Sequence, residues 1–293
     1  MGDYPPHMFR YFKLFVCFRV TDTSPFVFVF CALACEAKPL IKCWQLKKLP
    51  SADHPFGIYV GIDRAIVITG IGKINMAGAM GYVLALFKKP TPPILINLGI
   101  GGQRDEPRGT LCLGHKIIER ESGRCFYPQL PFSISCKTYS VITVCQPRNT
   151  YLTDELYEME AAGFYEIAIK FSVSELIQVL KIVSDNALSP ICDIDETLVE
   201  TWVEAQRPVI EELIVQLIAL RQLASVQANS VYSEMLETFH FTVSRSLKLK
   251  SLLQRWQVLK GGEAMPWREA NLKSAKELLA WIERHLNDLD FYL

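Results

Sequence analysis

The 293-residue chain lacks the features that mark several large classes of protein. Its 31 basic and 31 acidic side chains balance to a formal net charge of zero, so it has no excess positive charge for a polyanion such as bulk nucleic acid. No uninterrupted apolar run approaches the ~20 residues that cross a bilayer, and no internal repeat or low-complexity tract occurs. We therefore expect a globular protein whose partners include neither nucleic acid nor a membrane.

Metal-binding and disulfide signatures are missing as well. The nine cysteines are odd in number, stand singly and form no Cys-x-x-Cys pair. The five histidines are scattered and do not have the spacing of metal ligands. These patterns favour reduced thiols in a cytoplasmic protein, with no metal site and no cofactor.

The sequence does contain a regular alternation of strands and helices up to about residue 190. Apolar runs predict strands at 26–34, 58–62, 64–69, 94–98, 111–119, 139–145 and 178–184. Helical patterns occupy 37–47, 73–88 and 154–170. Such alternation is typical of a mainly parallel or mixed sheet with helices on both faces. We expect a three-layer α/β/α domain with a central mixed sheet at 24–226.

Beyond about residue 196 the strand signal ends. Apolar positions at three- and four-residue spacing predict helices at 209–226, 231–259 and 271–288. We expect an all-helical C-terminal extension at 227–293, whose apolar stripes pack on the α/β domain, on a second subunit or on a separate partner. Residues 1–23 are expected to form an N-terminal extension of unknown role.

Two glycine-rich turns follow apolar runs, at 66–73 (IVITGIGK) and 94–102 (ILINLGIGG). Runs of β-branched residues that end in glycine are typical of buried parallel strands whose backbone must approach a ligand. Acidic side chains follow or flank other candidate strands, namely Glu36, Glu158, Glu160 and Asp185. Because open α/β sheets bind ligands at the carboxyl ends of their strands, this order of residues predicts an enzyme site there.

Five segments resemble, in the same order, the motifs of 5′-methylthioadenosine/S-adenosylhomocysteine nucleosidases. Residues 36–40 (EAKPL) are similar to the Glu-x-x-Pro-Leu segment of that family, and 69–73 (TGIGK) to its Ser-Gly-Ile-Gly-Lys turn. Residues 97–102 (NLGIGG) resemble Asn-Thr-Gly-Ser-Ala-Gly-Gly, 158–162 (EMEAA) match Glu-Met-Glu-Ala, and 184–187 (SDNA) match Ser-Asp-x-Ala. The resemblance covers residues 26 to about 190. It implies the purine nucleoside phosphorylase/nucleosidase superfamily, the fold of that superfamily and a homodimer.

Cleavage of an N-glycosidic bond requires an acid that protonates the leaving base and a carboxylate that organises the nucleophile. The resemblance assigns the first role to Asp185, beside purine N7, where its carboxyl can also accept from a 6-amino group and so favours adenine. It assigns the second role to Glu36, which would orient a water, and the ribose hydroxyls to Glu160. The other residues that it implies in substrate binding are Met159, Glu158, Gly99, Ile100, Gly101, Gly102, Ser184 and Lys181.

The resemblance therefore implies a hydrolase that releases adenine from a nucleoside with a modified 5′ group, of the methylthioadenosine, S-adenosylhomocysteine or 5′-deoxyadenosine type. Ile100 stands where the family has serine, and Val144–Asn149 (VCQPRN) replaces its base-stacking segment. An acidic residue after a strand, taken alone, is more often a loop residue or a helix cap. A phosphorylase, a futalosine- or adenosylhopane-type hydrolase and a non-catalytic nucleoside-binding protein remain alternatives. The glycine turns carry no arginine for phosphate, which favours hydrolysis over phosphorolysis.

Overall fold

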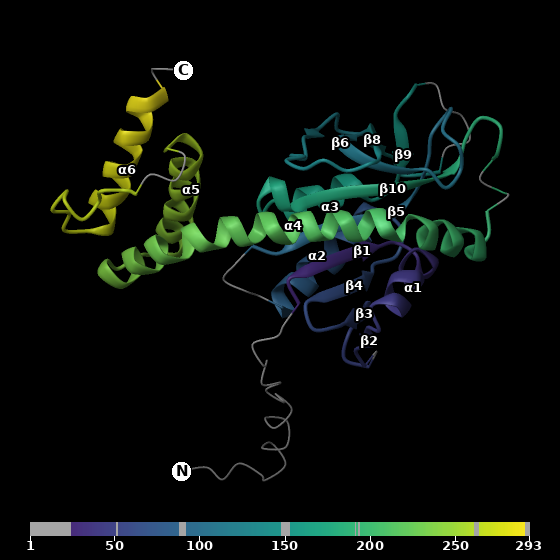
Figure 1. Ribbon diagram of the computed structural model, residues 1–293, viewed down its shortest axis with the longest axis horizontal. Coiled ribbons are helices and arrows are strands. Elements are labelled where there is room, and N and C mark those ends of the chain that lie inside the picture. Colours follow the sequence, from purple (N-terminus) through teal and green to yellow (C-terminus); the bar gives the residue numbers. More distant parts are fainter. Residues whose placement is uncertain are drawn as a thin grey trace, which may run out of the picture. The chain divides into compact units, whose positions relative to one another are not determined.

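The computed structural model describes residues 25–50, 52–87, 92–147, 153–190, 192, 194–260 and 264–290. The N-terminal extension predicted at 1–23 lies outside these residues. The chain divides into two compact units, an α/β unit up to Ile214 and a helical unit from Val215. The helices are α1 (Ala34–Cys43), α2 (Lys73–Leu86), α3 (Ala161–Ala168), α4 (Glu196–Thr238), α5 (Val243–Lys260) and α6 (Ala275–Asp290), with a 3₁₀ turn at Ser174–Leu176 (Figure 1). The domain boundary predicted at 226/227 falls within α4 and stays a prediction.

The described part of the α/β unit contains one sheet of ten strands. They are β1 (Val27–Cys31), β2 (Lys47–Lys48), β3 (Gly57–Val60), β4 (Arg64–Ile68), β5 (Ile94–Gly102), β6 (Leu111–Glu119), β7 (Cys125–Phe126), β8 (Lys137–Thr143), β9 (Leu156–Glu158) and β10 (Ile177–Asp185). Their order is β2-β3-β4-β1-β5-β10-β6-β8-β9, with β7 beside β6, and β9 returns to pair with β5. β1, β4, β5 and β10 run parallel, whereas β6 is antiparallel to β10. The predicted mixed sheet is confirmed.

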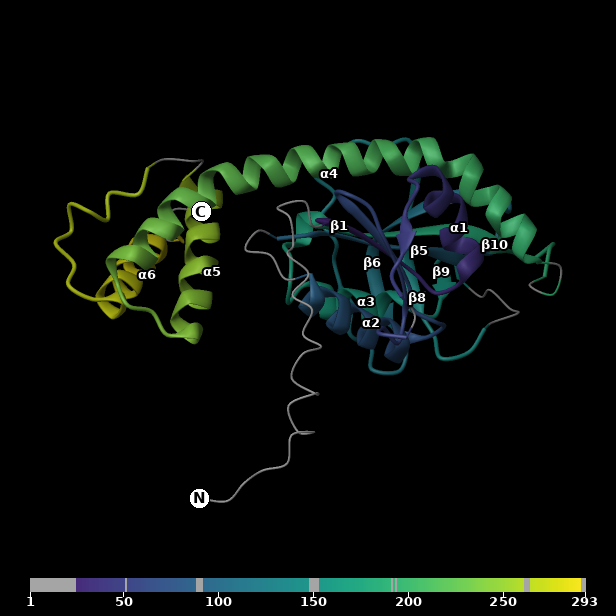
Figure 2. The same ribbon diagram turned by 90° about the horizontal axis from the view of Figure 1, so that it is seen from below.

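Helices cover both faces of this sheet. Figures 1 and 2 show α2 and α3 on one face, and α1 with the first part of α4 on the other. On the second face, Lys38 of α1 pairs with Glu200 of α4, and Arg64 of β4 pairs with Glu211 of α4, both at an N–O distance of 2.7 Å. The three-layer α/β/α arrangement is therefore the fold class that the sequence predicts.

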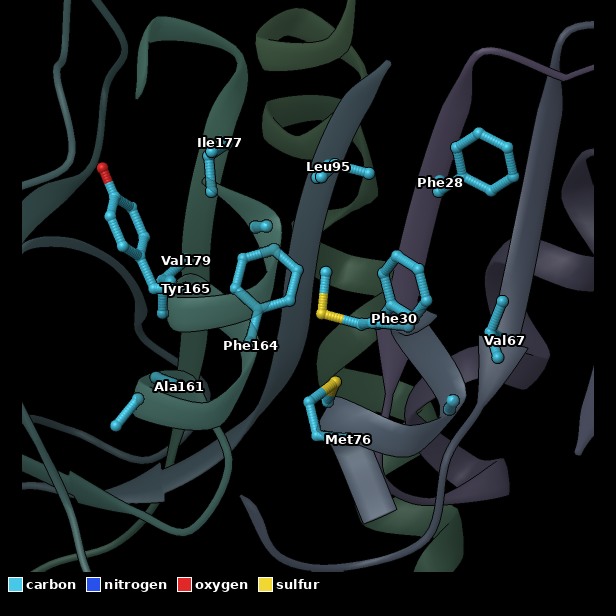
Figure 3. Close-up of a cluster of buried hydrophobic side chains, with 14 of the residues drawn as sticks. Phe28, Phe30, Val67, Met76, Leu95, Ala161, Phe164, Tyr165, Ile177 and Val179 are labelled. Carbon is cyan, nitrogen blue, oxygen red and sulfur yellow. The ribbon is translucent and has the colours of Figure 1, made fainter. Parts of the chain in front are cut away.

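Strand β1 lies at the centre of the hydrophobic core, and each of its residues is buried. Because side chains alternate along a strand, Phe28 and Phe30 share one face. There they pack with α2 and α3, where the Phe30 ring lies 6.1 Å from that of Phe164 and close to Met76 (Figure 3). A strand buried on both faces is fixed along its whole length, so the chain that leaves β1 at Ala32 starts from a rigid position.

Two strand ends differ from the sequence prediction. β1 ends at Cys31 rather than at residue 34, because α1 begins at Ala34 and the Glu36 carboxylate accepts the Leu33 N–H at 2.8 Å. β5 continues to Gly102 instead of ending at residue 98 in a glycine turn, because β10 pairs with it as far as Gly102. Both differences bring the predicted site residues onto regular elements.

The helix predicted at 154–170 begins only at Ala161. Leu156–Glu158 instead form β9, which pairs with Val141–Thr143 of β8. The Glu158 carboxylate accepts the N–H groups of Glu160 and Ala161 at 2.9 and 2.8 Å, so it caps the shorter helix. Strand pairing has thus overridden the helical spacing of these residues.

The helical unit has a hydrophobic core of its own. Its buried members are Met235, Leu249, Leu252, Trp256, Trp267, Leu278, Leu279, Ile282 and Leu286. The apolar stripes of the extension were expected to pack on the α/β domain, on a second subunit or on a partner. In the structure they instead pack against one another. Although α4 is 43 residues long, neither it nor any other described helix has a stretch that is apolar enough to cross a membrane.

Candidate active site

A cavity of about 690 Å³, measured with its opening to solvent, lies at the carboxyl ends of the strands. The predicted site residues that line it are Glu36, Ile100, Gly101, Gly102, Glu158, Met159, Glu160, Ser184 and Asp185. The other two, Gly99 and Lys181, lie beside Glu36: a Cβ added to Gly99 would be 3.1 Å from Glu36 Oε1 and 3.2 Å from Lys181 Nζ. The structure thus brings together side chains from α1, β5, β9 and β10 that are far apart in the sequence.

Glu36 has two functions in this geometry. Its Oε2 accepts the Leu33 N–H at 2.8 Å and so holds the first turn of α1, while its Oε1 accepts the Ile100 N–H of β5 at 3.0 Å. Burial raises the pKa of Glu36 to about 7, although the two N–H groups and the Lys181 charge favour its ionised form. A carboxyl that is half-ionised near neutral pH can serve as a general base.

Glu158, Glu160 and Lys181 form a buried ionic cluster next to Glu36. Lys181 Nζ lies 2.8 Å from Glu158 Oε2 and 3.7 Å from Glu160 Oε2, and the Lys181 side chain is 1% exposed. Burial acts to lower the pKa of Lys181, but attraction to the two carboxylates outweighs it and raises that pKa. Burial also raises the pKa of Glu160, whose Oε1 accepts the Gly72 N–H at 2.8 Å.

Asp185 ends β10 on another wall of the cavity. Burial raises its pKa to about 6, against the opposing charge of Arg108. The Ser184 hydroxyl donates to Asp185 Oδ1, and the Asp185 carbonyl accepts the Gln103 N–H at 3.0 Å. A buried carboxyl of this kind keeps its proton to a higher pH than an exposed aspartate does, so it is suited to donating that proton.

Glu36 and Asp185 meet β5 two residues apart. Glu36 accepts the N–H of Ile100, and Asp185 lies in register with Gly102. Both residues line the same cavity but come from different elements, α1 and β10. One carboxyl can therefore protonate a leaving group while the other directs a water.

The close approach of β9 to β5 requires glycine at position 101. A Cβ there would lie 2.6 Å from Leu156 Cδ2 and 2.8 Å from the Tyr157 carbonyl oxygen. We expect Gly101→Ala to lower the free energy of unfolding by about 1–3 kcal/mol, measured by urea unfolding. Gly81→Ala is the matched control, because Gly81 in α2 has open space around its Cβ position and alanine is the better helix former. Equal stability of the two variants would contradict this packing.

The apolar walls of the cavity were not predicted from the sequence. They include Leu33, Ile71, Val144, Pro147 and Tyr157. A single apolar residue gives no sequence signal for a binding site, although Ile71 stands inside a predicted glycine turn and Val144 and Pro147 inside the segment noted as replacing the family's base-stacking residues. Arg148 and Asn149 of that segment lie outside the described residues. Among the residues with a described position, no three His, Cys, Asp or Glu side chains are grouped to hold a metal ion.

Solved structures of nucleosidases share this fold. A 5′-methylthioadenosine nucleosidase from Arabidopsis thaliana is 16% identical, with a TM-score of 0.56 over 66% of this chain and 96% of that chain. A futalosine hydrolase from Helicobacter pylori is 13% identical, with a TM-score of 0.53 over 66% of this chain and 99% of that chain. A 5′-methylthioadenosine/S-adenosylhomocysteine nucleosidase from Colwellia psychrerythraea, in complex with adenine, is 17% identical, with a TM-score of 0.50 over 67% and 95%.

No protein-family model matches the sequence, and no curated protein matches it. Identities of 13–17% to the solved structures show the fold alone. The chain therefore has the fold of these nucleosidases, which is the fold that the resemblance of the five motifs predicted.

Proposed function

We propose that the protein hydrolyses the N-glycosidic bond of an adenine nucleoside with a modified 5′ group and releases adenine. The observation that carries this proposal is the pair of buried carboxyls, Glu36 and Asp185, which line one cavity and whose pKa values burial raises to about 7 and about 6. Each is poised near neutral pH for proton transfer, and the two approach β5 from separate elements.

In the proposed reaction, protonated Asp185 gives its proton to N7 of the base as the bond between the ribosyl C1′ and N9 breaks. The electron pair of that bond leaves with the base, and the sugar becomes oxocarbenium-like. Ionised Glu36 accepts a proton from a water whose oxygen bonds to C1′. Glu160 would hold the ribose hydroxyls, a task for which its two oxygens are suited.

The charge around Glu36 favours water over phosphate as the nucleophile. Among the residues that the structure describes, Glu36, Glu158 and Glu160 share one ammonium, that of Lys181. A phosphate dianion would add like charge to this cluster, and like charges at close range in a buried site are costly.

In the glycine turn before α2, two of the groups that could bind an anion are already paired with carboxylates. The Gly72 N–H donates to Glu160 at 2.8 Å, and Lys73 Nζ donates to Glu119 and Glu121 at 2.7 and 2.9 Å. Phosphate bound to the Gly72 N–H or to Lys73 Nζ would have to displace these carboxylates. Both observations oppose the phosphorylase alternative.

Two observations support an adenine nucleoside with an apolar 5′ group. Proteins of the same fold include a 5′-methylthioadenosine nucleosidase and a nucleosidase in complex with adenine. The cavity walls also present Leu33, Ile71, Pro147 and Met159 to a ligand, and such side chains suit an alkylthio group better than a hydroxyl. A homodimer remains a prediction from the resemblance, and a cytoplasmic location remains a prediction from the cysteine pattern.

The proposal predicts a bell-shaped dependence of kcat/KM on pH, with its maximum near ~6.5. The productive form needs Asp185 protonated, which is lost above its pKa of about 6, and Glu36 ionised, which is lost below its pKa of about 7. Adenine release from 5′-methylthioadenosine between pH 4.5 and 9 measures the profile. A rate that rises without limit toward alkaline pH would contradict the acid role of Asp185.

The same assay tests the substrate class when 5′-methylthioinosine and adenosine are compared with 5′-methylthioadenosine. We expect the highest kcat/KM for methylthioadenosine. A preference for the hypoxanthine base would instead select the futalosine-type alternative. Tight binding of all three nucleosides without release of base would select the non-catalytic alternative.

A further inference from the structure

Glu158 lines the cavity, but its carboxylate is already fully bonded to the protein. Oε1 accepts the Thr143 hydroxyl at 2.5 Å. Oε2 accepts the N–H groups of Glu160 and Ala161 and lies 2.8 Å from Lys181 Nζ. The Glu158 side chain is 0% exposed. A carboxylate with these partners has little capacity left for a sugar hydroxyl, which argues against direct substrate binding.

These contacts fix the ammonium of Lys181 closer to Glu158 than to the other two carboxyls. Its N–O distance is 2.8 Å to Glu158 and 3.7 Å to Glu160, and it acts on Glu36 by Coulomb attraction. The three donors on Glu158 hold the acceptor in place, and the rigid β10 backbone holds the other end of the lysine. The position of the positive charge is therefore set by Glu158.

We infer that Glu158 is a positioning residue that acts through Lys181. Glu158 holds the Lys181 ammonium away from Glu36, so the negative charge of ionised Glu36 is only weakly stabilised by a cation. Glu36 therefore stays a base strong enough to accept a proton from water. This inference rests on the proposed function. An ammonium in direct contact with Glu36 would stabilise the ionised form, and a more acidic carboxyl is a weaker base for water.

The other charged and titratable groups around Glu36 come from four elements. They are Cys31 of β1, Cys35 of α1, Lys181 of β10 and Glu160 at the start of α3. Burial raises the pKa of both thiols, so they stay neutral near pH 7. Lys181 is thus the cation in this surrounding set, and its distance to Glu36 is the quantity that Glu158 controls.

The test is the titration of Glu36 itself, followed by NMR of glutamate labelled at the side-chain carboxyl and assigned with Glu36→Gln. In Glu158→Gln, Lys181 loses its nearest carboxylate and is freed toward Glu36, so the Glu36 transition should move to lower pH by about one pH unit. In Lys181→Met the transition should move to higher pH by a similar amount. Glu119→Gln is the control: it removes the carboxylate that pairs with Lys73, and it should leave the Glu36 transition at the same pH.

The pH optimum of kcat/KM lies midway between the Glu36 and Asp185 transitions, so it should shift by about half as much as the Glu36 transition does. We expect it about half a pH unit lower in Glu158→Gln and about half a pH unit higher in Lys181→Met. An unshifted Glu36 titration in Glu158→Gln or in Lys181→Met, with or without loss of stability, would overturn the inference and leave Glu158 as a helix cap only. The NMR titration of Glu36 needs no substrate, so this outcome can be told apart from a failure of the proposed function. That failure would appear as wild-type protein that releases no adenine.

Discussion

Asp185→Asn is expected to lower kcat for adenine release by about 10²–10⁴-fold, while the affinity for adenine changes little. Asparagine has nearly the same shape and can still accept from the Ser184 hydroxyl, which donates to Asp185 Oδ1. It has no proton to give to the leaving base. The result is measured by single-turnover release of adenine from 5′-methylthioadenosine, with adenine binding followed by calorimetry.

Asp105→Asn is the matched control for this substitution. Asp105 lies on the loop after β5, its side chain is largely exposed, and its carboxylate pairs with Arg104 at 2.8 Å. We expect wild-type turnover from the control. Wild-type turnover from Asp185→Asn itself would refute the role of Asp185 as the acid, and a similar loss in both variants would mean that the loop rather than the carboxyl is at fault.

Glu36→Gln is expected to lower kcat by about 10²–10⁴-fold and to change the pH profile. The residual activity should no longer fall at acid pH, because the group whose ionisation limits that side is gone. It should still fall above the Asp185 pKa of about 6, because Asp185 must be protonated. Glu200→Gln on α4 is the control, since Glu200 pairs with Lys38 at the surface. A Glu36→Gln enzyme with an unchanged acid limb would contradict the base role.

The same variant has an expected effect on stability. Burial raises the folded-state pKa of Glu36 from 4.5 to about 7, so the folded state holds a proton that the unfolded chain releases. The stability due to Glu36 is therefore fully present below pH ~4.5 and is lost as pH rises through ~7. When the pH is raised from 5 to 8, the free energy of unfolding of the wild type should fall by about 2–3 kcal/mol more than that of Glu36→Gln. Urea unfolding, together with amide hydrogen exchange in β1 and β5, gives the free energy of unfolding of both proteins at each pH. An equal fall of this free energy with pH in the two proteins would contradict the prediction.

The order of motifs in the sequence predicted the acidic and glycine residues that meet around the cavity, but not its apolar walls. Glu36, Gly102 and Asp185 follow or end β1, β5 and β10, which run parallel. Parallel strands bring their carboxyl ends to one edge, so position along the chain translates into position in space. Glu160 follows β9, which pairs antiparallel with β5, so this rule does not place it. The fold class followed for the same reason, since the strand signals of β3, β4, β6 and β10 are strong and local.

What the sequence could not supply depends on contacts between distant residues. The bond from the Ile100 N–H to Glu36 joins β5 to α1, and it decides that Glu36 is at once a helix cap and a cavity residue. The pairing of β9 with β8 turned a predicted helix start into a strand and gave Glu158 its place beside Lys181. In each case a local pattern allowed two outcomes and tertiary packing chose between them.

The helical unit shows the same limit in another form. Apolar spacing correctly predicted that this region is helical, but the bounds predicted at 209–226 and 231–259 are wrong, because α4 continues to Thr238 and α5 begins at Val243. A stripe of apolar residues also does not say which surface covers it. Trp256 and Trp281 stack at 6.1 Å, and Phe239 meets Trp267 at 6.0 Å within the unit. The cover therefore comes from inside the extension.

The source of the oxygen on the released sugar tests the central claim most directly. The protein is incubated with 5′-methylthioadenosine in water enriched in heavy oxygen, with and without phosphate, and the products are identified by mass spectrometry. The proposed chemistry gives adenine and 5-methylthioribose that carries one oxygen from water, at a rate independent of phosphate. A sugar 1-phosphate that forms only when phosphate is present, or intact nucleoside after prolonged incubation, would contradict it.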